Sequence, residues 1–405
     1  MQVYAIAGGG LAAVSAVEAL RRVGFEGRIV LIGDESESPY QRPPLSKDFL
    51  RGETSAQTLP LRSAEFYRLA NVELLLGDVV TSVSPQMRRL KCASGTEIAY
   101  DKLLLATGGT PRRLHVPGAD LPGIRYLRTV ADATELRAQF ERHPSVLVIG
   151  GGFIGCEVAA SARLLGCDVT VVSPSAPMAH ALGDEVGAIV AQRHRSRGVT
   201  LVTGTVTEFR GTTALEAVAL SDGRVLECSL AVVGIGIVPN LSMVPELDTR
   251  DGIVTDEFCR TQIPDVFAAG DVAKAWRPRL ARHARLEHFD NAELQGAAAG
   301  AAMGGKGEPY DPIPFFWSDQ YDFELQYYGS PATWDATIVR GAPPEQFAAF
   351  YIAGGRIEGI CLVNRSRDAN AAKRLLGRTN LAPRDLADDG VSFAALVRGE
   401  AAPQP

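Results

Sequence analysis

Paired cysteines are absent from this sequence, and their absence excludes a fold held together by disulfides. The six cysteines are scattered, and no two of them form a CxxC or CxxxxC spacing. A disulfide framework needs paired cysteines and an oxidising compartment. We therefore expect inert thiols in a reducing compartment, which favours a cytoplasmic protein.

Long apolar runs and a surplus of positive charge are also missing. No uninterrupted apolar stretch reaches the roughly 18 residues of a membrane-spanning helix, so no membrane association is expected. No basic region precedes the first apolar run, so we expect no signal peptide. With a net charge of -6, the chain as a whole is not expected to bind nucleic acid.

The remaining bulk properties are those of a soluble globular protein. Hydrophobic residues make up 46% of the chain and charged residues 22%, both ordinary proportions. A length of 405 residues favours roughly two to three domains.

A glycine-rich stretch follows the first apolar run at residues 3–7. Its spacing is Gly8-x-Gly10-x-x-Ala13, the GxGxxA form of the dinucleotide fingerprint, and a helical pattern follows at 11–23. The first glycine turns the chain, and the second lets the backbone approach a pyrophosphate. The third small residue lets the helix pack on the strand, while the helix N-terminus offers N–H groups to the phosphates.

A second copy of the fingerprint follows a predicted strand at 146–149. It reads Gly150-x-Gly152-x-x-Gly155 and is followed by Glu157. One such match is weak, because glycine-rich turns also connect strands to helices without binding a nucleotide. Two matches, each in the right context, favour two nucleotide sites over two structural turns.

The second strands of the two copies end differently. A strand at 28–32 leads to Asp34 and Glu35, and an acid at this place accepts the ribose hydroxyls of adenosine, with Glu35 the preferred ligand. A strand at 168–172 leads instead to Ser173, with neither an acid nor an arginine directly after it. The strongest cue for NADH or NADPH is therefore missing, although a neutral serine suits a ribose without repelling a phosphate.

Two prolines flanked by cations form the next feature, Arg42-Pro-Pro-Leu-Ser-Lys47. The prolines fix φ and remove two N–H donors, so this segment is predicted to be rigid. A rigid segment with two cations suits a polyanionic or electron-accepting ligand. A solvated surface loop is the alternative interpretation.

Two further predicted strands end on residues that suit a ligand site. The strand at 102–106 runs into Thr107-Gly108, and the apolar run at 265–269 ends in Gly270-Asp271. Ligands of open α/β sheets bind at the carboxyl ends of the strands. For Asp271, capping of the next helix is the alternative.

The other predicted elements are short. They are strands at 72–76, 79–84 and 89–92, a helix at 124–143, two strands within 217–239 with a turn at 233–239, and a strand at 253–254.

A basic run at 274–288 stands out on an acidic protein. It carries Lys274, Arg277, Arg279, Arg282 and Arg285 before the first acid, Glu287. A solvated loop is the plain interpretation. A docking patch for an acidic partner is the sharper one.

The composition changes after residue 313. Residues 314–328 are the most aromatic segment of the chain, and strand patterns follow at 337–340, 346–352 and 356–362. A helix is predicted to begin near Asn370. This region indicates a small α+β domain, whose core would use the aromatic residues.

With these motifs in place, the chain resembles the FAD-dependent NADH:ferredoxin reductases of bacterial oxygenase systems. These are the reductase components of aromatic-ring dioxygenases and the putidaredoxin-type reductases of P450 systems. The resemblance runs to about residue 397. The motifs that carry it are Arg42-Pro-Pro-Leu-Ser-Lys47, Ala106-Thr-Gly108, Gly150-x-Gly152-x-x-Gly155-x-Glu157, Val233-Gly-Ile-Gly236, Phe267-Ala-Ala-Gly-Asp271 and Phe316-Trp-Ser-Asp319.

The resemblance implies two Rossmann-like dinucleotide-binding domains of the glutathione-reductase type and a C-terminal α+β domain. We expect an FAD-binding domain at 1–114 and 240–313, an NAD(P)H-binding domain at 115–239 and the C-terminal domain at 314–405.

The resemblance also implies residues for each cofactor. For FAD they are Gly8, Gly10, Leu11, Ala12, Ala13, Asp34, Glu35, Arg42, Pro44, Lys47, Val80, Ala106, Thr107, Gly108, Asp271 and Trp317. For NADH, with NADPH as an alternative, they are Gly150, Gly152, Phe153, Ile154, Gly155, Glu157, Ser173, Gly234, Ile235 and Gly236. No metal ligands are expected.

Four of the implied residues would act in the reaction. Lys47 is expected near the redox-active edge of the flavin, and Glu157 near the nicotinamide. Glu287 and Trp317 are expected to close the site. The family has tryptophan two positions after that glutamate, and this chain has Phe289, so an indole role there is in doubt.

The implied activity passes electrons from NAD(P)H through FAD to a 2Fe–2S ferredoxin that serves an oxygenase. The disulfide-reductase and peroxidase branches of the superfamily need cysteine near residues 42–47, and none is present. Two alternatives stay open. One is a reductase for rubredoxin, nitrite reductase or a quinone, and the other is an NADH-responsive interaction flavoprotein similar to apoptosis-inducing factor. A monomer or a homodimer fits equally well.

Overall fold

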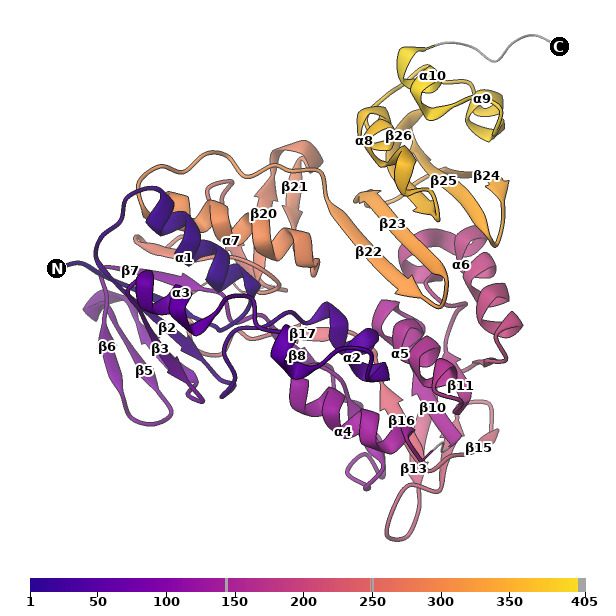
Figure 1. Ribbon diagram of the computed structural model, residues 1–405, viewed down its shortest axis with the longest axis horizontal. Helices are drawn as coiled ribbons and strands as arrows, with labels where there is room; N and C mark the ends of the chain where they lie inside the picture. The colour runs from indigo at the N-terminus through magenta and orange to yellow at the C-terminus, as the bar shows by residue number, and fades with distance from the viewer. Residues whose placement is uncertain (143–144, 248, 250, 400–405) are drawn as a thin grey trace. The chain divides into compact units, whose positions relative to one another are not determined.

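The computed structural model describes residues 1–142, 145–247, 249 and 251–399, which fall into two compact units. The first unit comprises Met1–Gln41, Ala56–Thr110 and Ile237–Pro314. The second comprises Arg42–Ser55, Pro111–Gly236 and the chain from Phe315 onward. Figure 1 shows the elements of both. No helix in the described ranges is long and apolar enough to cross a lipid bilayer.

A five-stranded parallel sheet forms the centre of the first unit, in the order β19-β7-β1-β2-β3. Its strands are almost entirely apolar because both faces are covered. The strands are β1 (Val3–Ala7), β2 (Arg28–Gly33), β3 (Val72–Leu76), β7 (Lys102–Leu105) and β19 (Val266–Ala268).

Helices α1 (Leu11–Arg22) and α7 (Phe289–Met303) pack against each other beside this sheet (Figure 1). The contact is so close that only glycine fits at two places on α7. A Cβ on Gly296 would lie 2.2 Å from the Ala12 carbonyl oxygen, and one on Gly300 would lie 2.4 Å from that of Ala16. This packing holds the N-terminus of α1 at the carboxyl edge of the sheet.

Smaller elements complete the first unit. They are α3 (Ala64–Leu69), the antiparallel sheet β4 (Val80–Ser84), β5 (Arg89–Cys92) and β6 (Glu97–Ala99), the pair β8 (Gly109–Pro111) and β17 (Ile237–Pro239), and the sheet β18 (Ile253–Thr255), β20 (Ala273–Arg277) and β21 (Arg282–Ala284).

The basic run at 274–288 is not the solvated loop of the plain interpretation. Strands β20 and β21 form an antiparallel hairpin, closed by a single 3-10 turn at Pro278–Leu280. Alternation along β20 buries Ala273, Ala275 and Arg277, whose guanidinium donates to Asn291 Oδ1 at 3.1 Å and to the Pro312 carbonyl at 2.6 Å. A charge count along the sequence does not reveal that one of these cations is in the core.

The second unit contains another five-stranded parallel sheet, in the order β12-β11-β10-β16-β9. Helices α4 (Val130–Phe140), α5 (Phe153–Leu164) and α6 (Ala179–Ser196) connect its strands. The strands are β9 (Ile124–Tyr126), β10 (Ser145–Ile149), β11 (Asp168–Ser173), β12 (Thr200–Thr203) and β16 (Leu230–Val233).

Two sequence predictions in this region need correction. The helix predicted at 124–143 is confirmed over α4, which begins after a capping box of Thr129 and Asp132, but its first residues form an edge strand, β9, and residue 143 lies outside the described residues. The region 217–239 has four strands instead of two, because turns at 221–224 and 228–229 divide it. These are β14 (Ala217–Leu220), β15 (Val225–Glu227), β16 and β17, and β13 (Val206–Arg210) precedes them.

An antiparallel sheet follows in the C-terminal part of the second unit, in the order β22-β23-β26-β25-β24. Its inner face packs on α5 and α6 through a shared core that includes Cys156, Leu182 and Tyr327. Its elements are β22 (Phe315–Gln320), β23 (Phe323–Gly329), β24 (Ala336–Ala342), β25 (Gln346–Ala353), β26 (Arg356–Val363), α8 (Ala369–Leu375), α9 (Pro383–Ala387) and α10 (Phe393–Arg398).

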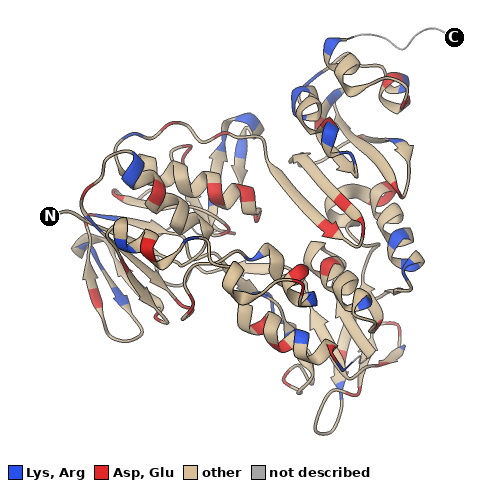
Figure 2. Ribbon diagram, viewed as in Figure 1, with Lys and Arg blue, Asp and Glu red and all other residues tan. Residues whose placement is uncertain are grey.

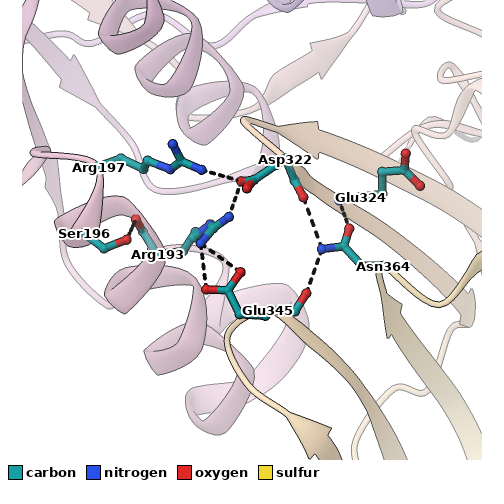
Figure 3. A network of polar contacts seen from close by, with 7 residues as sticks. All are labelled: Arg193, Ser196, Arg197, Asp322, Glu324, Glu345 and Asn364. Atoms are coloured by element: carbon teal, nitrogen blue, oxygen red, sulfur yellow. Dashed lines mark hydrogen bonds and ion pairs between the residues drawn. The ribbon is translucent and has the colours of Figure 1, made fainter.

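A polar network joins this sheet to α6 (Figure 3). Arg193 of α6 bonds Glu345 Oε1 at 3.0 Å and also the Asp322 carboxylate, which Arg197 contacts at 2.7 Å. Asn364 donates to the backbone carbonyls of Asp322 and Glu345. The Arg193 side chain is only 9% exposed, so its charge is largely desolvated and depends on these two carboxylates.

We predict that Arg193→Met destabilises the second unit by about 1–3 kcal/mol, because a buried, doubly paired guanidinium is lost and two carboxylates are left close together. Arg197→Met is the matched control. It removes a more exposed partner of the same Asp322 and is expected to cost under about 1 kcal/mol. Thermal unfolding of the two full-length variants measures the difference, and equal midpoints would contradict the prediction.

Candidate functional site

The carboxyl edge of the first parallel sheet gathers several predicted site residues. Gly8 and Gly10 follow β1, Thr107 and Gly108 follow β7, and Asp271 follows β19. Neighbouring parallel strands end at the same edge, so the turns that carry these residues lie together. Asp34 and Glu35 leave the same edge after β2.

Different geometric reasons explain why glycine occupies the two positions of the first fingerprint. Gly8 has φ +124°, and a Cβ there would lie 2.0 Å from the Ala106 carbonyl oxygen. Gly10 is the N-cap of α1, and apart from its own atoms and its two chain neighbours no heavy atom of the described chain lies within 4 Å of its would-be Cβ. We call this open space before α1 the first cradle. A phosphate fits such a space, because the first N–H groups of the helix point into it.

Neighbouring side chains stabilise this edge, and the sequence analysis missed two of them. Thr107 Oγ1 donates to the Asn240 carbonyl, and the Asn240 amide donates to the Thr107 carbonyl, both at 2.9 Å. The buried Gln295 of α7 accepts the Gly270 N–H at 2.9 Å, directly before Asp271. Asn240 and Gln295 carry no local motif, so only the fold reveals them.

The other predicted FAD residues of this unit differ in accessibility. Ala12 and Ala13 are buried between α1, α7 and the sheet, and Val80 is buried in the core, so packing accounts for their small or apolar side chains. Leu11 is half-buried at the start of α1. Glu35 accepts a hydrogen bond from the Tyr40 hydroxyl, which orients its carboxylate.

The second parallel sheet repeats the arrangement. Gly150 has φ +113°, and its Cβ would lie 2.3 Å from the Gly234 carbonyl oxygen, while a Cβ on Gly155 would lie 2.1 Å from that of Gly150. Gly152 is the N-cap of α5 and, apart from its own atoms and its two chain neighbours, has no described heavy atom within 4 Å of its would-be Cβ. This open space before α5 is the second cradle.

The remaining predicted NAD residues border this edge. Ile154 is exposed in the first turn of α5, and Phe153 packs edge-on against Phe316 with ring centroids 4.6 Å apart. Ile235 and Gly236 follow β16, and Gly236 has φ +94°.

Ser173 differs from the expectation of a ready ribose ligand. It ends β11, is 7% exposed, and donates from Oγ to the Ser175 carbonyl at 2.6 Å. Its hydroxyl proton is thus engaged by the Ser175 carbonyl of the same turn and is not free to bond a ribose. On the adjacent strand end, Arg224 donates to the Thr203 carbonyl at 2.6 Å and pairs with Asp222.

Glu157 is the centre of a buried polar cluster in the second unit. It lies on α5, is 3% exposed, and its Oε2 is 3.0 Å from Lys47 Nζ. Ser46 Oγ donates to the same oxygen at 2.5 Å, and Ser318 Oγ donates to Oε1 at 2.7 Å. Three segments distant in sequence therefore meet at one carboxylate: the turn at 42–47, helix α5 and strand β22.

Several hydrogen bonds hold the turn that carries Lys47, whose prolines predict a rigid segment. Pro43–Ser46 forms a 3-10 turn in which the Lys47 N–H bonds the Pro44 carbonyl at 3.0 Å. Arg42 donates from Nη1 to the Arg128 carbonyl at 2.7 Å. Ser161 of α5 donates to the Ser46 carbonyl at 2.7 Å, which ties the turn to the helix. Any contact of Arg42 or Pro44 with a flavin stays a prediction.

Strand β22 presents different residues on its two faces. Ser318 and Gln320 are buried against α5 and α6, whereas Trp317 alternates with them and stacks on Phe315 at 6.0 Å. The Trp317 side chain also hydrogen-bonds Asp319. Glu287, in the first unit, is exposed and pairs with Arg285. The joint closing role of Glu287 and Trp317 stays a prediction.

Comparison with known proteins gives a match over nearly the whole chain. The family described as Pyridine nucleotide-disulphide oxidoreductase matches residues 2–296, and the one described as Reductase C-terminal matches residues 315–397. The anthranilate 1,2-dioxygenase system ferredoxin–NAD(+) reductase component of Burkholderia cepacia is 40% identical, over 97% of this chain and 99% of its own length.

Two solved structures are similar throughout. The ferredoxin reductase for the CYP199A2 system from Rhodopseudomonas palustris has a TM-score of 0.93 and 36% identity, covering 98% of this chain and 100% of its own. Putidaredoxin reductase in its covalent complex with putidaredoxin has a TM-score of 0.93 and 34% identity, covering 99% of each chain. These matches confirm the predicted fold class.

We predict that Gly8→Ala and Gly10→Ala lose bound flavin for different reasons. Gly8→Ala forces a Cβ onto backbone and strains φ, so it lowers both thermal stability and flavin content. Gly10→Ala has room for its Cβ within the protein but fills the first cradle, so it weakens flavin binding and leaves the stability of the apoprotein near wild type. Absorbance of bound flavin and unfolding of the apoproteins separate the two effects. A Gly10→Ala protein that keeps its full flavin content would contradict the prediction.

Proposed function

The chain belongs to the pyridine nucleotide-disulphide oxidoreductase family, among the ferredoxin reductases of bacterial oxygenase systems, and from this premise we propose that it passes electrons from NAD(P)H through FAD to a 2Fe–2S ferredoxin. Members of this family use FAD and a nicotinamide nucleotide, which confirms both predicted cofactors. The observation that carries the proposal is the pair of open cradles, one at the carboxyl edge of each parallel sheet.

The thiols of the chain support an external electron acceptor. All six cysteines are free and buried, and none lies in the turn at 42–47. Burial raises the pKa of Cys228 and Cys259 to about 12, so these thiols stay protonated at neutral pH. With no reactive thiolate or dithiol pair, we infer that electrons leave the flavin for a separate protein.

We assign FAD to the first cradle. Gly8 and Gly10 let the backbone approach the pyrophosphate, Glu35 suits the ribose, and Thr107 and Asp271 border the same edge. When bound, FAD supplies the chemistry of accepting a hydride and releasing electrons one at a time. The protein supplies position and charge, and Lys47 carries the positive charge expected near the reacting edge of the flavin.

Glu157 and Ser46 give Lys47 a fixed place. Because the carboxylate pairs with Lys47 Nζ at 3.0 Å and the Lys47 side chain is only 12% exposed, this long side chain is held in one position. A preorganised cation does not have to reorganise when negative charge develops near it. We propose this as the catalytic contribution of the turn at 42–47.

We assign NAD(P)H to the second cradle, with NADH preferred. The names of several relatives specify NAD(+), which favours NADH. The chain has Ser173 where a carboxylate would exclude the 2′-phosphate of NADPH. Because the Ser173 hydroxyl is engaged by Ser175, the preference for NADH is expected to be modest.

The acceptor we propose is a small acidic ferredoxin that serves an aromatic-ring dioxygenase or a P450. Similar proteins act in anthranilate and biphenyl dioxygenase systems, and putidaredoxin reductase forms a complex with putidaredoxin. Figure 2 shows Lys and Arg positions on the β20–β21 hairpin, one candidate dock. Its charge is smaller than its sequence suggests, since Arg277 is buried, Arg279 Nε lies 3.9 Å from Asp311 Oδ2, and Arg285 pairs with Asp251.

The domain division and the cellular location complete the proposal. We propose the division into FAD-binding (1–114 and 240–313), NAD(P)H-binding (115–239) and C-terminal (314–405) domains. We also propose a cytoplasmic location, because six free thiols suit a reducing compartment.

Anaerobic reduction tests the function directly. We expect NADH to bleach the flavin absorbance of the purified protein faster than NADPH does. An excess of oxidised 2Fe–2S ferredoxin should then restore the flavin absorbance and itself become reduced. A protein that binds no FAD, or that NADH reduces but no ferredoxin, rubredoxin or quinone reoxidises within seconds, would contradict the proposal.

We predict that Lys47→Met slows flavin reduction by NADH about 10²-fold while FAD stays bound, because a preorganised cation is lost. The single variant also leaves the Glu157 carboxylate buried without its cation, which lowers stability. The double variant Lys47→Met/Glu157→Gln removes that unpaired charge. Stopped-flow absorbance should show slow reduction in both, whereas thermal unfolding should show recovery in the double variant. A double variant that reduces as fast as wild type would remove Lys47 from the reaction.

A further inference from the structure

The hydrogen bonds around Glu157 continue past Ser318 into the interior of the second unit. Gln320 Nε2 is 3.1 Å from Ser318 Oγ, and His194 Nε2 is 2.9 Å from Gln320 Oε1. The Tyr321 hydroxyl lies 3.1 Å from His194 Nδ1. Gln320 is 3% exposed and His194 is 1% exposed, so water does not compete for these bonds. We call Ser318, Gln320, His194 and Tyr321 the buried chain.

With a neutral His194 ring, only one assignment of protons satisfies every bond in the buried chain. A carboxylate only accepts, so the Ser318 hydroxyl donates to Glu157 and must itself accept from the Gln320 amide N–H. The Gln320 carbonyl then accepts from Nε2–H of His194, whose Nδ1 is left to accept from Tyr321. Every donor therefore points toward Glu157, and each bond polarises the next in the same direction.

The surroundings of His194 favour this arrangement. Burial lowers the pKa of His194 to about 4, so the ring is neutral and carries one N–H at neutral pH. Two cations close to it along the chain, Arg193 and Arg197, are paired with Asp322, and Arg195 is also adjacent in sequence. Tyr321 reaches the ring from a backbone with φ +56°, a conformation that is unfavourable for a tyrosine and is held here by the β22–β23 turn.

We propose that His194 and Gln320 are positioning residues that orient Glu157, and through it Lys47, for the reaction. The inference rests on the proposed function. The Ser318 bond fixes Oε1 of Glu157, which leaves Oε2 facing Ser46 and Lys47. Because the Gln320 amide occupies an acceptor position of Ser318, the serine proton is directed at Glu157. Without that amide, the hydroxyl and the carboxylate both gain freedom to rotate.

The first experiment detects the coupling without measuring activity. The chain has six histidines, so ¹⁵N-histidine labelling of the oxidised full-length protein gives few signals, and His194→Gln identifies the Nε2–H resonance of His194. Glu157→Gln, at the other end of the chain, is expected to shift that resonance, and a Ser318→Ala background is expected to abolish the shift. A His194 resonance that does not respond to Glu157→Gln would overturn the proposal.

The second experiment measures the effect on the reaction. His194→Met removes the donor to Gln320, and we expect hydride transfer from NADH to slow roughly three- to tenfold, the factor of one net hydrogen bond, with unchanged NADH affinity. His194→Gln places an amide N–H near the position of Nε2 and should restore most of the rate. Cys361→Ala, buried in the same sheet but outside the buried chain, controls for packing loss. Equal rates in His194→Met, His194→Gln and Cys361→Ala would overturn the proposal.

The two experiments also separate this inference from the proposed function. A wild-type protein that NADH does not reduce would refute the function, while the labelling experiment would still decide whether the buried chain couples to Glu157. If His194→Met does not fold, the labelling experiment on wild type, Glu157→Gln and Ser318→Ala decides alone.

Discussion

The buried ion pair between Lys47 and Glu157 is the contact on which the second unit depends. A carboxylate taken out of water is tolerated only when its charge and lone pairs are matched, and Glu157 has a cation and two hydroxyl donors. Those partners come from a proline-rich turn, the helix after the second fingerprint and the first strand of the C-terminal sheet. The pair therefore does more than supply charge, because forming it requires three remote segments to be in place at once.

The glycine motifs could be predicted from the sequence because their causes are local. Gly8 and Gly150 occupy backbone conformations with positive φ, where a Cβ would overlap a carbonyl oxygen of the adjacent strand connection. Gly10 and Gly152 are different, since the described protein leaves open space where their side chains would be. The spacing of the glycines reflects both requirements: a backbone with positive φ, which the fold needs, and open space before the helix, which a ligand needs. The two parallel sheets follow from the same local strand-to-helix patterns.

The partners of those motifs could not be predicted, because they are set by tertiary contacts. Ser318 lies within the motif at 316–319, but the motif does not indicate which residue its hydroxyl contacts, and His194 lies in no motif at all. The same limit explains the strand β9 at the start of a predicted helix, where pairing with β16 outweighs local helical preference. It also explains Arg277, which reads as part of a basic surface run but is buried beside Tyr310, Asn291 and the Pro312 carbonyl.

The C-terminal sheet contributes to the polar cluster around Glu157 because β22 alternates its side chains. Residues two apart on one face, Ser318 and Gln320, bond to α5 and α6, so the other face, with Trp317, has a defined orientation. A slip of one residue in the register of β22 would exchange the two faces and place an indole where Glu157 needs a hydroxyl. Arg193 opposes such a slip, because it pairs with Asp322 in the β22–β23 turn and with Glu345, which directly precedes β25. The ion pairs of Arg193 and the hydrogen bonds of Ser318 and Gln320 thus favour the same register of β22. That register determines which residue of β22 contacts the Glu157 carboxylate.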